Sequence, residues 1–147
     1  MLPNEKNDLV YLLNILEYIG KIWKYTEGIN DAEELYGKND QMNLNATLTL
    51  LTNIGENASK ITEKLKQEYS HIEWHHIKNF RNRIVHNYAG IDLAIVYEVI
   101  TNDLKILKHG LEKIIKEKAN LKIFDFEEIK ICKESYFYKH IDFEKIM

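Results

Sequence analysis

Apolar residues recur at helical spacing along the chain, most clearly near its start. One stripe consists of Leu9, Leu12, Leu13, Leu16, Ile19 and Trp23. A second stripe follows another face of the same segment and consists of Tyr11, Ile15, Tyr18, Ile22 and Tyr25. Intervals of three and four residues place side chains on one face of a helix. A helix that is apolar on two faces needs two partners, so we expect one face to enter the core and the other to be available to a second subunit.

Capping patterns and apolar intervals predict the next helices. Asp31 in DAEE (31–34) has a carboxylate three residues later, which is the pattern of a helix N-cap. A long helix is predicted over roughly residues 41–68. Its apolar positions are Leu44, Leu48, Leu51, Ala58, Ile61 and Leu65.

The second half of the chain predicts two more long helices. SHIE (70–73) is a capping-box pattern that should start a helix at His71. Gly90 should break this helix, and Asp92 should cap the next one, which runs to about residue 118. The apolar positions of these two helices are Trp74, Ile77, Phe80, Ile84, Leu93, Val96, Ile100, Leu104, Leu107, Leu111 and Ile114.

Together these patterns predict the fold class. The only proline is Pro3 and the chain has six glycines, so helix breakers are scarce. We expect an all-α protein, an up-down bundle of four long helices plus short helices, over residues 1–120. Residues 121–147 are rich in aromatic and acidic side chains and should form a C-terminal extension. This extension could hold one more short helix or pack as an arm, and the sequence assigns it no role.

Composition limits where the protein can work. Hydrophobic residues make up 45% of the chain, enough for a sizeable core, and no apolar run approaches the roughly 18 to 20 residues that cross a bilayer. The start, MLPNEKNDLV, lacks the basic and apolar segments of a secretory signal. The single cysteine, Cys132, has no partner for an internal disulfide. We therefore expect a cytoplasmic protein with no membrane association.

Charge is unevenly distributed along the chain. The net charge of −3 argues against a protein that binds nucleic acid over its whole surface. Residues 1–59 carry a net −5, residues 60–124 a net +4 and residues 125–147 a net −2. The basic middle contains the stretch RNRIVHNY (81–88). This favours an anionic ligand there, although a charged surface without a partner would have the same balance.

RNRIVHNY brings an arginine and a histidine into one short stretch. Arg81 keeps its charge at any working pH and offers a planar fork of donors, whereas His86 belongs to the residue type whose ordinary pKa is about 6.5. Five helical positions turn through about 500°, so the two side chains point about 140° apart. They meet at one ligand if the helix ends or bends near His86, or if a second chain contributes. Otherwise both are ordinary surface or helix-end groups.

This pair suits phosphodiester chemistry on RNA. RNA carries its own nucleophile, the 2′-hydroxyl. A base for that hydroxyl, an acid for the leaving 5′-oxygen and a cation beside the phosphorus suffice without a metal or other cofactor. Two copies of His86 facing each other across a two-fold axis would share the acid and base roles.

The same stretch resembles the Arg-x-x-x-x-His motif of the HEPN superfamily and, in extended form, the Arg-Asn-x-x-x-His-x-Tyr motif of HepT-type toxins. The matching positions are Arg81, Asn82, His86 and Tyr88. Upstream, IGENASKI (54–61) resembles the family's Gly-Glu segment at Gly55 and Glu56, and Trp74 and the acid in AGID (89–92) also fit. The resemblance covers roughly residues 5–118 and implies a HEPN-like helical bundle that forms a homodimer.

The resemblance also implies an activity. HEPN ribonucleases are metal-independent, need no cofactor and cut RNA at a cleft between two subunits, leaving a 2′,3′-cyclic phosphate. Carried over, Arg81 would stabilise the phosphate and His86 would be the general acid and base. Asn82, Arg83 and Glu56 would bind substrate or orient the site. For Glu56, a solvated helix position is the alternative.

Finally, the resemblance implies a partner. HepT toxins are paired with a small nucleotidyltransferase antitoxin, MntA, which adds AMP to the tyrosine of the motif, here Tyr88. The added bulk and negative charge beside Arg81 would repel RNA. The expected protein is thus the toxin of a type VII-like HEPN/MNT toxin–antitoxin system. The alternatives are a non-catalytic helical dimer that binds a nucleotide or nucleotidyltransferase, and a Tyr88 that only packs against the helix end.

Other candidate groups carry weaker signals. His71 and His75 lie one helical turn apart, with His76 beside them, but no third ligand has a clear spacing, so we predict no metal site. A basic face on the fourth long helix is expected to be solvated, with RNA-backbone contact as the alternative. Its members are Lys105, Lys108, Lys113, Lys116, Lys118 and Lys122.

Overall fold

The computed structural model describes residues 5–147, and these fold into helices and connecting turns without strands. The long helices are α1 (Glu5–Tyr25), α3 (Met42–Lys60), α5 (Trp74–His86) and α7 (Leu104–Asn120). The shorter ones are α2 (Ala32–Gly37), η1 (Lys38–Gln41), α4 (Glu63–Glu68), η2 (Tyr88–Gly90), α6 (Leu93–Glu98), the π-helical η3 (Val99–Asp103), α8 (Phe126–Lys133) and η4 (Phe143–Lys145). Because α6, η3 and α7 follow one another directly, the four predicted long helices are all present, which confirms the fold class.

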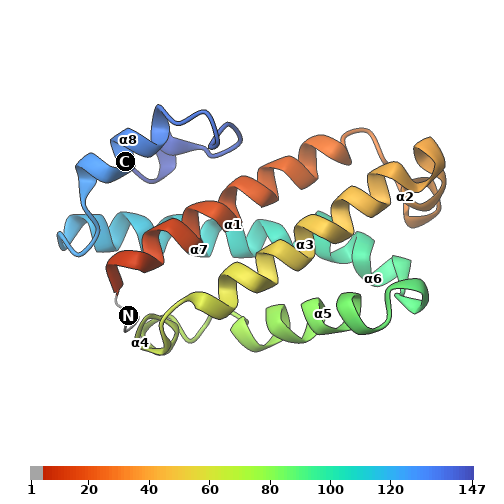
Figure 1. The fold of residues 1–147 in the computed structure, drawn as a ribbon, viewed down its shortest axis with the longest axis horizontal. Coiled ribbons are helices and arrows are strands. Elements are labelled where there is room, and N and C mark those ends of the chain that lie inside the picture. The colour runs from red at the N-terminus through yellow and green to blue at the C-terminus, as the bar shows by residue number, and fades with distance from the viewer. Residues whose placement is uncertain (1–4) are drawn as a thin grey trace.

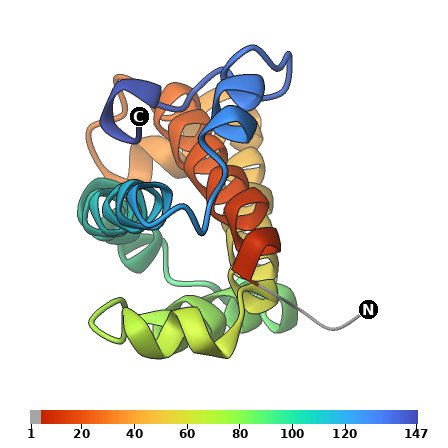
Figure 2. The same cartoon turned by 90° about the vertical axis from the view of Figure 1, so that its left-hand side faces the viewer.

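The long helices form layers around α1 and α3. These two lie side by side, and α5 packs along the other side of α3 (Figure 1). Turned by 90°, the molecule shows α5 and α7 as separate layers, with α1 and α3 connecting them (Figure 2). Over residues 5–147, none of the helices has both the length and the apolar character needed to span a membrane.

The aliphatic residues of both apolar stripes of α1 are buried within the chain itself. Leu12, Leu13 and Ile19 of the first stripe have no exposed surface. Ile15 and Ile22 of the second stripe are equally buried, whereas Tyr25 at its end is 41% exposed. The aliphatic part of this face is therefore covered within the chain, and a second subunit at its exposed end stays a prediction. The physical reason for the burial is that α1 is a central helix, enclosed by neighbouring helices and by the C-terminal extension (Figure 2).

The C-terminal extension packs on α1 through polar contacts. The buried carboxylate of Glu17 accepts a hydrogen bond from the backbone N–H of His140 at 2.7 Å and lies 2.6 Å from the Nδ1 atom of that ring. The Tyr138 hydroxyl donates to the Oδ1 atom of Asn14 at 2.7 Å. The expected short helix is α8, and the remaining residues form a packed arm that ends in η4 (Figure 1).

The helix predicted over residues 41–68 is divided into α3 and α4, because the chain turns at Ile61 and Thr62. Both residues adopt extended backbone angles there. The backbone N–H of Thr62 donates to Asp8 at 2.9 Å, and its hydroxyl donates to the same carboxylate at 2.7 Å. The hydroxyl oxygen also accepts from the N–H of Leu65, so Thr62 caps α4. Asp8 lies 54 residues away in sequence, which explains why local periodicity missed the break.

The predicted start at His71 is also wrong, since α5 begins at Trp74 with Glu73 as an N-cap that makes no side-chain capping bond. The turn before it is held by other bonds: the Trp74 N–H donates to the Ile72 carbonyl at 2.8 Å, and the indole Nε1 donates to the Tyr69 carbonyl at 3.1 Å. These tertiary contacts replace the predicted capping box.

Two predicted caps are confirmed. Asp31 accepts from the N–H of Glu34, and Asp92 accepts from the N–H of Ala94. The helix that Gly90 was expected to end stops earlier, at His86, and Gly90 closes the turn η2. Pro3 lies outside the described residues.

Candidate active site

The candidate site is built where α3 and α5 cross closely. At Gly55 of α3 there is no room for a side chain, because a Cβ atom would lie 2.3 Å from Cβ and 2.5 Å from Cγ of Arg81 on α5. Real Cβ atoms do not approach so closely, so only glycine permits this crossing. The Gly-Glu pair singled out in the sequence is thus the place where α3 receives Arg81.

The guanidinium of Arg81 is held on two sides. Its Nη2 atom forms an ion pair with Oε1 of Glu56, and its Nη1 atom donates to Oδ1 of Asn82 at 2.8 Å. Its Nε atom is buried and has no hydrogen-bond partner among the described residues. The side chains of Arg81 and Glu56 remain 30% and 43% exposed. The guanidinium is therefore oriented by the protein and still reachable by an anion from solvent.

His86 lies apart from this cluster within one chain. It is the last residue of α5, its side chain is exposed, and it makes no hydrogen bond to any of residues 5–147 through that side chain. The helix runs unbroken from Arg81 to His86, so the two side chains leave it about 140° apart. The helix ends at His86, as one of the expected ways requires, but it does not bend between the two residues, so its end alone does not turn the two side chains toward one point. A second chain that contributes one of them is the other expected way, and it stays a prediction.

Tyr88 is displayed on the turn that follows α5. The residue is 47% exposed, and its hydroxyl donates to Oδ1 of Asn45 at 2.6 Å. The sequence analysis missed Asn45. The sequence feature that could have identified Asn45 is its spacing from Glu56. The two residues lie eleven positions apart on α3, about three turns, and so share a face. The same face of α3 thus contacts both Arg81 and Tyr88.

The structure brings together only some of the site residues that the sequence predicted. Glu56, Arg81 and Asn82 form one cluster, with Tyr88 beyond it on the same pair of helices. Arg83 lies two positions after Arg81 and projects from a different face of α5. It does not join the cluster.

The histidines near the start of α5 do not converge on a common point. His76 lies 3.4 Å from Glu73 as an exposed pair, and His71 packs edge-on against the ring of Tyr69. Within residues 5–147, no group of three or more His, Cys, Asp or Glu side chains is placed to hold a metal ion.

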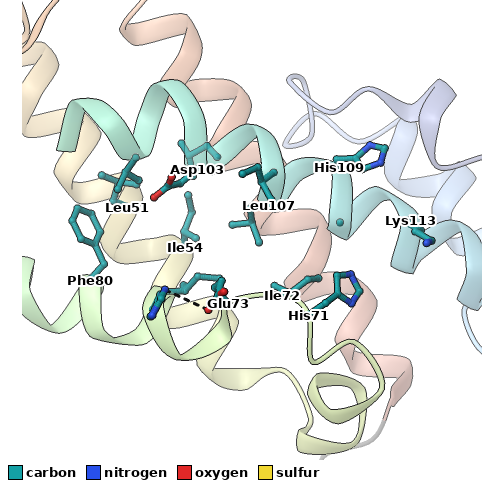
Figure 3. Close-up of a pocket in the computed structure, with 16 residues that line it drawn as sticks. Leu51, Ile54, His71, Ile72, Glu73, Phe80, Asp103, Leu107, His109 and Lys113 are labelled. Atoms are coloured by element: carbon teal, nitrogen blue, oxygen red, sulfur yellow. Dashed lines mark ion pairs between the residues drawn. The ribbon is translucent and has the colours of Figure 1, made fainter. Parts of the chain in front are cut away.

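An apolar groove of about 450 Å³ separates α5 from α7 (Figure 3). Leu51, Ile54, Phe80 and Leu107 line it, with polar groups at its edges. Among these, Asp103 has its carboxyl pKa raised, first by burial and then by the carboxylate of Glu98, while His76 lowers it. Phe80 projects into this groove, whereas the next residue, Arg81, contacts α3. Phe80 and Arg81 leave α5 about 100° apart, so the groove lies on a different face of α5 from the arginine cluster.

Comparison with known proteins places this chain in a family. A family model described as Ribonuclease HepT-like matches residues 15–114. This span covers most of the four long helices and every residue of the site, and ends before the C-terminal extension. The chain belongs to the HepT-like ribonuclease family, which confirms the resemblance noted in RNRIVHNY.

Curated relatives carry consistent names. "Putative RNase MJ1216" of Methanocaldococcus jannaschii is 30% identical over 113 residues, which cover 76% of this chain and 91% of that protein. "Putative RNase MJ0125" of the same organism is 31% identical over 113 residues, covering 76% and 95%. "Probable ribonuclease HepT" of Thermococcus cleftensis is 29% identical over 106 residues, covering 72% and 94%. No solved structure matches the chain significantly.

Proposed function

We propose that this protein is an RNA endonuclease that works as a homodimer and needs no metal ion. The observation that carries the proposal is the Arg81 guanidinium, fixed by Glu56 and Asn82 and still open to solvent, in a chain of the HepT-like ribonuclease family. A fixed, partly exposed guanidinium binds a phosphodiester through paired charge-assisted hydrogen bonds.

The proposed reaction uses the nucleophile of RNA itself. A His86 imidazole accepts the proton of the 2′-hydroxyl as that oxygen forms a bond to phosphorus. The bond from phosphorus to the 5′-oxygen breaks, and a protonated His86 donates a proton to this leaving oxygen. Arg81 stabilises the charge on the non-bridging oxygens. The products are a 2′,3′-cyclic phosphate and a 5′-hydroxyl, so protons and bonds balance without another reactant.

Helix geometry supports the proposal of a homodimer. Arg81 and His86 leave one α5 about 140° apart, so a single chain presents them to different directions. A two-fold axis near the C-terminal end of α5 would bring the exposed His86 of one subunit to the Arg81 cluster of its partner. Two copies of His86 at one cleft would supply the base and the acid.

We also propose that the protein is the toxin of a toxin–antitoxin pair, neutralised at Tyr88. Tyr88 is partly exposed and its hydroxyl is oriented by Asn45, so a nucleotidyltransferase antitoxin of the MntA type would reach it and transfer AMP from ATP, releasing pyrophosphate. The added phosphate would repel RNA from the Arg81 cluster.

Expression in a bacterial host tests the nuclease. The wild-type chain should arrest growth, and His86→Ala should relieve the arrest, whereas His109→Ala, a histidine on α7, should not. In vitro, cleavage should persist in the presence of a chelator and should stop when the substrate is 2′-O-methyl RNA. Equal toxicity of the wild type and His86→Ala would refute the proposed chemistry.

Intact-mass measurement tests the modification. Co-expression with a nucleotidyltransferase of the MntA type should add the mass of one or more AMP groups to the wild-type chain and none to Tyr88→Phe. A modified Tyr88→Phe protein would show that the acceptor is another residue.

One observation favours a second function, a non-catalytic helical dimer that binds a nucleotide or nucleotidyltransferase. Arg81 is already paired with Glu56 and Asn82, and His86 lies apart from it. Purified protein that binds its nucleotidyltransferase but leaves a broad panel of RNAs intact would support this second function over the first.

A further inference from the structure

A second groove lies beside the arginine cluster, between the end of α3, α4 and the start of α5, where α4 adjoins both helices (Figure 1). Its volume is about 550 Å³, within the range of sites that hold a small organic ligand. Ser59 of α3, Gln67 of α4, and Trp74 and Lys78 of α5 are among the residues that line it.

Both helices lead from the arginine cluster into this groove. On α3, Ser59 follows Glu56 by three residues and so lies one turn further along the same side. On α5, Lys78 and Trp74 precede Arg81 by three and seven residues and share its face. The seven residues rise by about 10 Å along the helix axis, a length that the base, sugar and phosphate of one nucleotide span together.

The side chains of the groove suit a nucleotide. The indole of Trp74 is half-buried and fixed by its hydrogen bond to the Tyr69 carbonyl, and stacking of a base on an aromatic ring contributes about 1–3 kcal/mol. Lys78 is exposed and makes no ion pair with any of residues 5–147. Gln67 and Ser70 line the groove and offer donors and acceptors for the edge of a base.

The acidic groups of the groove restrict the class of ligand that it can bind. Glu63 lines it and pairs with Lys66 at 3.8 Å, and Glu73 lines it and pairs with His76 at 3.4 Å. The groove is therefore of mixed charge rather than strongly cationic. Such a lining disfavours a polyphosphate and is compatible with a neutral base that carries one phosphate.

We infer that this groove is the subsite for the nucleotide next to the scissile phosphate of a single-stranded RNA. The base stacks on Trp74, and the phosphate contacts Lys78, one turn before Arg81. The strand is single because a base must leave a duplex stack to lie on an aromatic ring. This inference rests on the proposed ribonuclease function and adds the substrate class and two residues to it.

The test is a binding titration that needs no cleavage. Full-length protein is titrated with a short single-stranded 2′-O-methyl RNA of mixed sequence, and tryptophan fluorescence is followed at several salt concentrations. RNA should quench the emission of the wild type. Trp74→Phe should lose the quench while Trp23 still emits, and should retain RNA binding because phenylalanine also stacks.

Lys78→Ala should lower the slope of log affinity against log salt by about 0.7, the value for one phosphate contact on a single strand. The matched control is Lys133→Ala on α8, on the far side of the molecule (Figure 2), and its slope should equal that of the wild type. RNA binding with an undiminished quench in Trp74→Phe, or with equal slopes for the two lysine variants, would overturn the subsite alone. No RNA binding by the wild type would overturn the subsite and the RNA substrate together.

Discussion

Arg81 is the residue on which the candidate site depends, and besides its neighbour Asn82 its position is set by residues 25 or more positions away. Glu56 holds one end of the guanidinium, and Gly55 leaves room for its aliphatic part. The ion pair is partly exposed, so its contribution to stability is small, about 0–1 kcal/mol. We interpret its main role as orientation of the guanidinium.

Glu56→Gln should distinguish the effect of Arg81 orientation on kcat from the effect of site charge on RNA binding. The substitution leaves Arg81 less firmly held, and kcat for RNA cleavage should fall about tenfold, because a misplaced donor loses about 1.4 kcal/mol of transition-state stabilisation. KM should fall as well, since the site loses a negative charge. Steady-state kinetics at fixed salt check both constants. Glu127→Gln on α8 makes the same charge change far from the site and should leave both unchanged, and an unaltered kcat in Glu56→Gln would contradict the orienting role.

Tyr138 should report on the docked C-terminal extension at high pH. Burial, and then the nearby Cys132, Tyr18 and carboxylates, raise the pKa of its hydroxyl from 10.0 to about 12. In the unfolded chain the hydroxyl ionises near 10, so the folded state binds this proton longer and stability is lost as pH rises from 10 to 12.

Ultraviolet absorbance titration should show one tyrosine that ionises near pH 12 in the wild type. In Tyr138→Phe no tyrosine should ionise at so high a pH. Denaturant unfolding should show a steeper loss of stability above pH 10 in the wild type than in the variant. Identical titration curves for the two proteins would contradict the raised pKa.

At the scale of secondary-structure elements, local patterns located the helices, and tertiary contacts set their ends. The apolar intervals of α1, α3, α5 and α7 are visible in the sequence, as are the caps at Asp31 and Asp92. The break at Thr62 depends on Asp8 of another helix, and the start of α5 depends on the indole of Trp74 reaching back to Tyr69. Such contacts leave no periodic signal.

The crossing of α3 and α5 should be the element contact most sensitive to a methyl group. Gly55→Ala places a Cβ atom where Arg81 already lies, so α5 must shift. We expect a loss of about 1–3 kcal/mol in the free energy of unfolding, together with loss of cleavage. Denaturant unfolding measures the first effect.

Gly37→Ala is the matched control, because a Cβ atom there meets nothing within 4 Å and the backbone is helical. It should be neutral or slightly stabilising, as alanine reduces the entropy of the unfolded chain. Equal unfolding free energies for the two variants would show that α5 accommodates the methyl group without cost.

At the scale of the whole molecule, the C-terminal extension completes the enclosure of α1. Glu17 is fully buried and receives two contacts from His140, and Gly20 lets the extension approach, since a Cβ atom there would lie 2.5 Å from His140. The extension lies beyond the part of the chain that matches the family model. The extension and α5 lie on opposite sides of the molecule (Figure 2).

Glu17→Gln should loosen this docking. A hydrogen bond to a charged group contributes about 1.5–3 kcal/mol, and the amide replaces the carboxylate that His140 contacts. We expect a lower unfolding temperature and faster tryptic cleavage at Lys139. Glu27→Gln, an exposed position just after α1, should match the wild type in both measurements. Equal cleavage rates for the two variants would show that the extension is held by its apolar contacts instead.

The sequence alone determined the helical class, the four long helices, the family and the motif residues, because each is written in local spacing and residue type. The tertiary structure decided which of those residues meet. It paired Arg81 with Glu56 and brought Asn45 within hydrogen-bond distance of the Tyr88 hydroxyl. It left His86 outside the arginine cluster and packed the C-terminal extension against α1. The physical reason is that periodicity fixes the direction of a side chain about its own helix axis, whereas contacts between distant segments depend on how the helices cross.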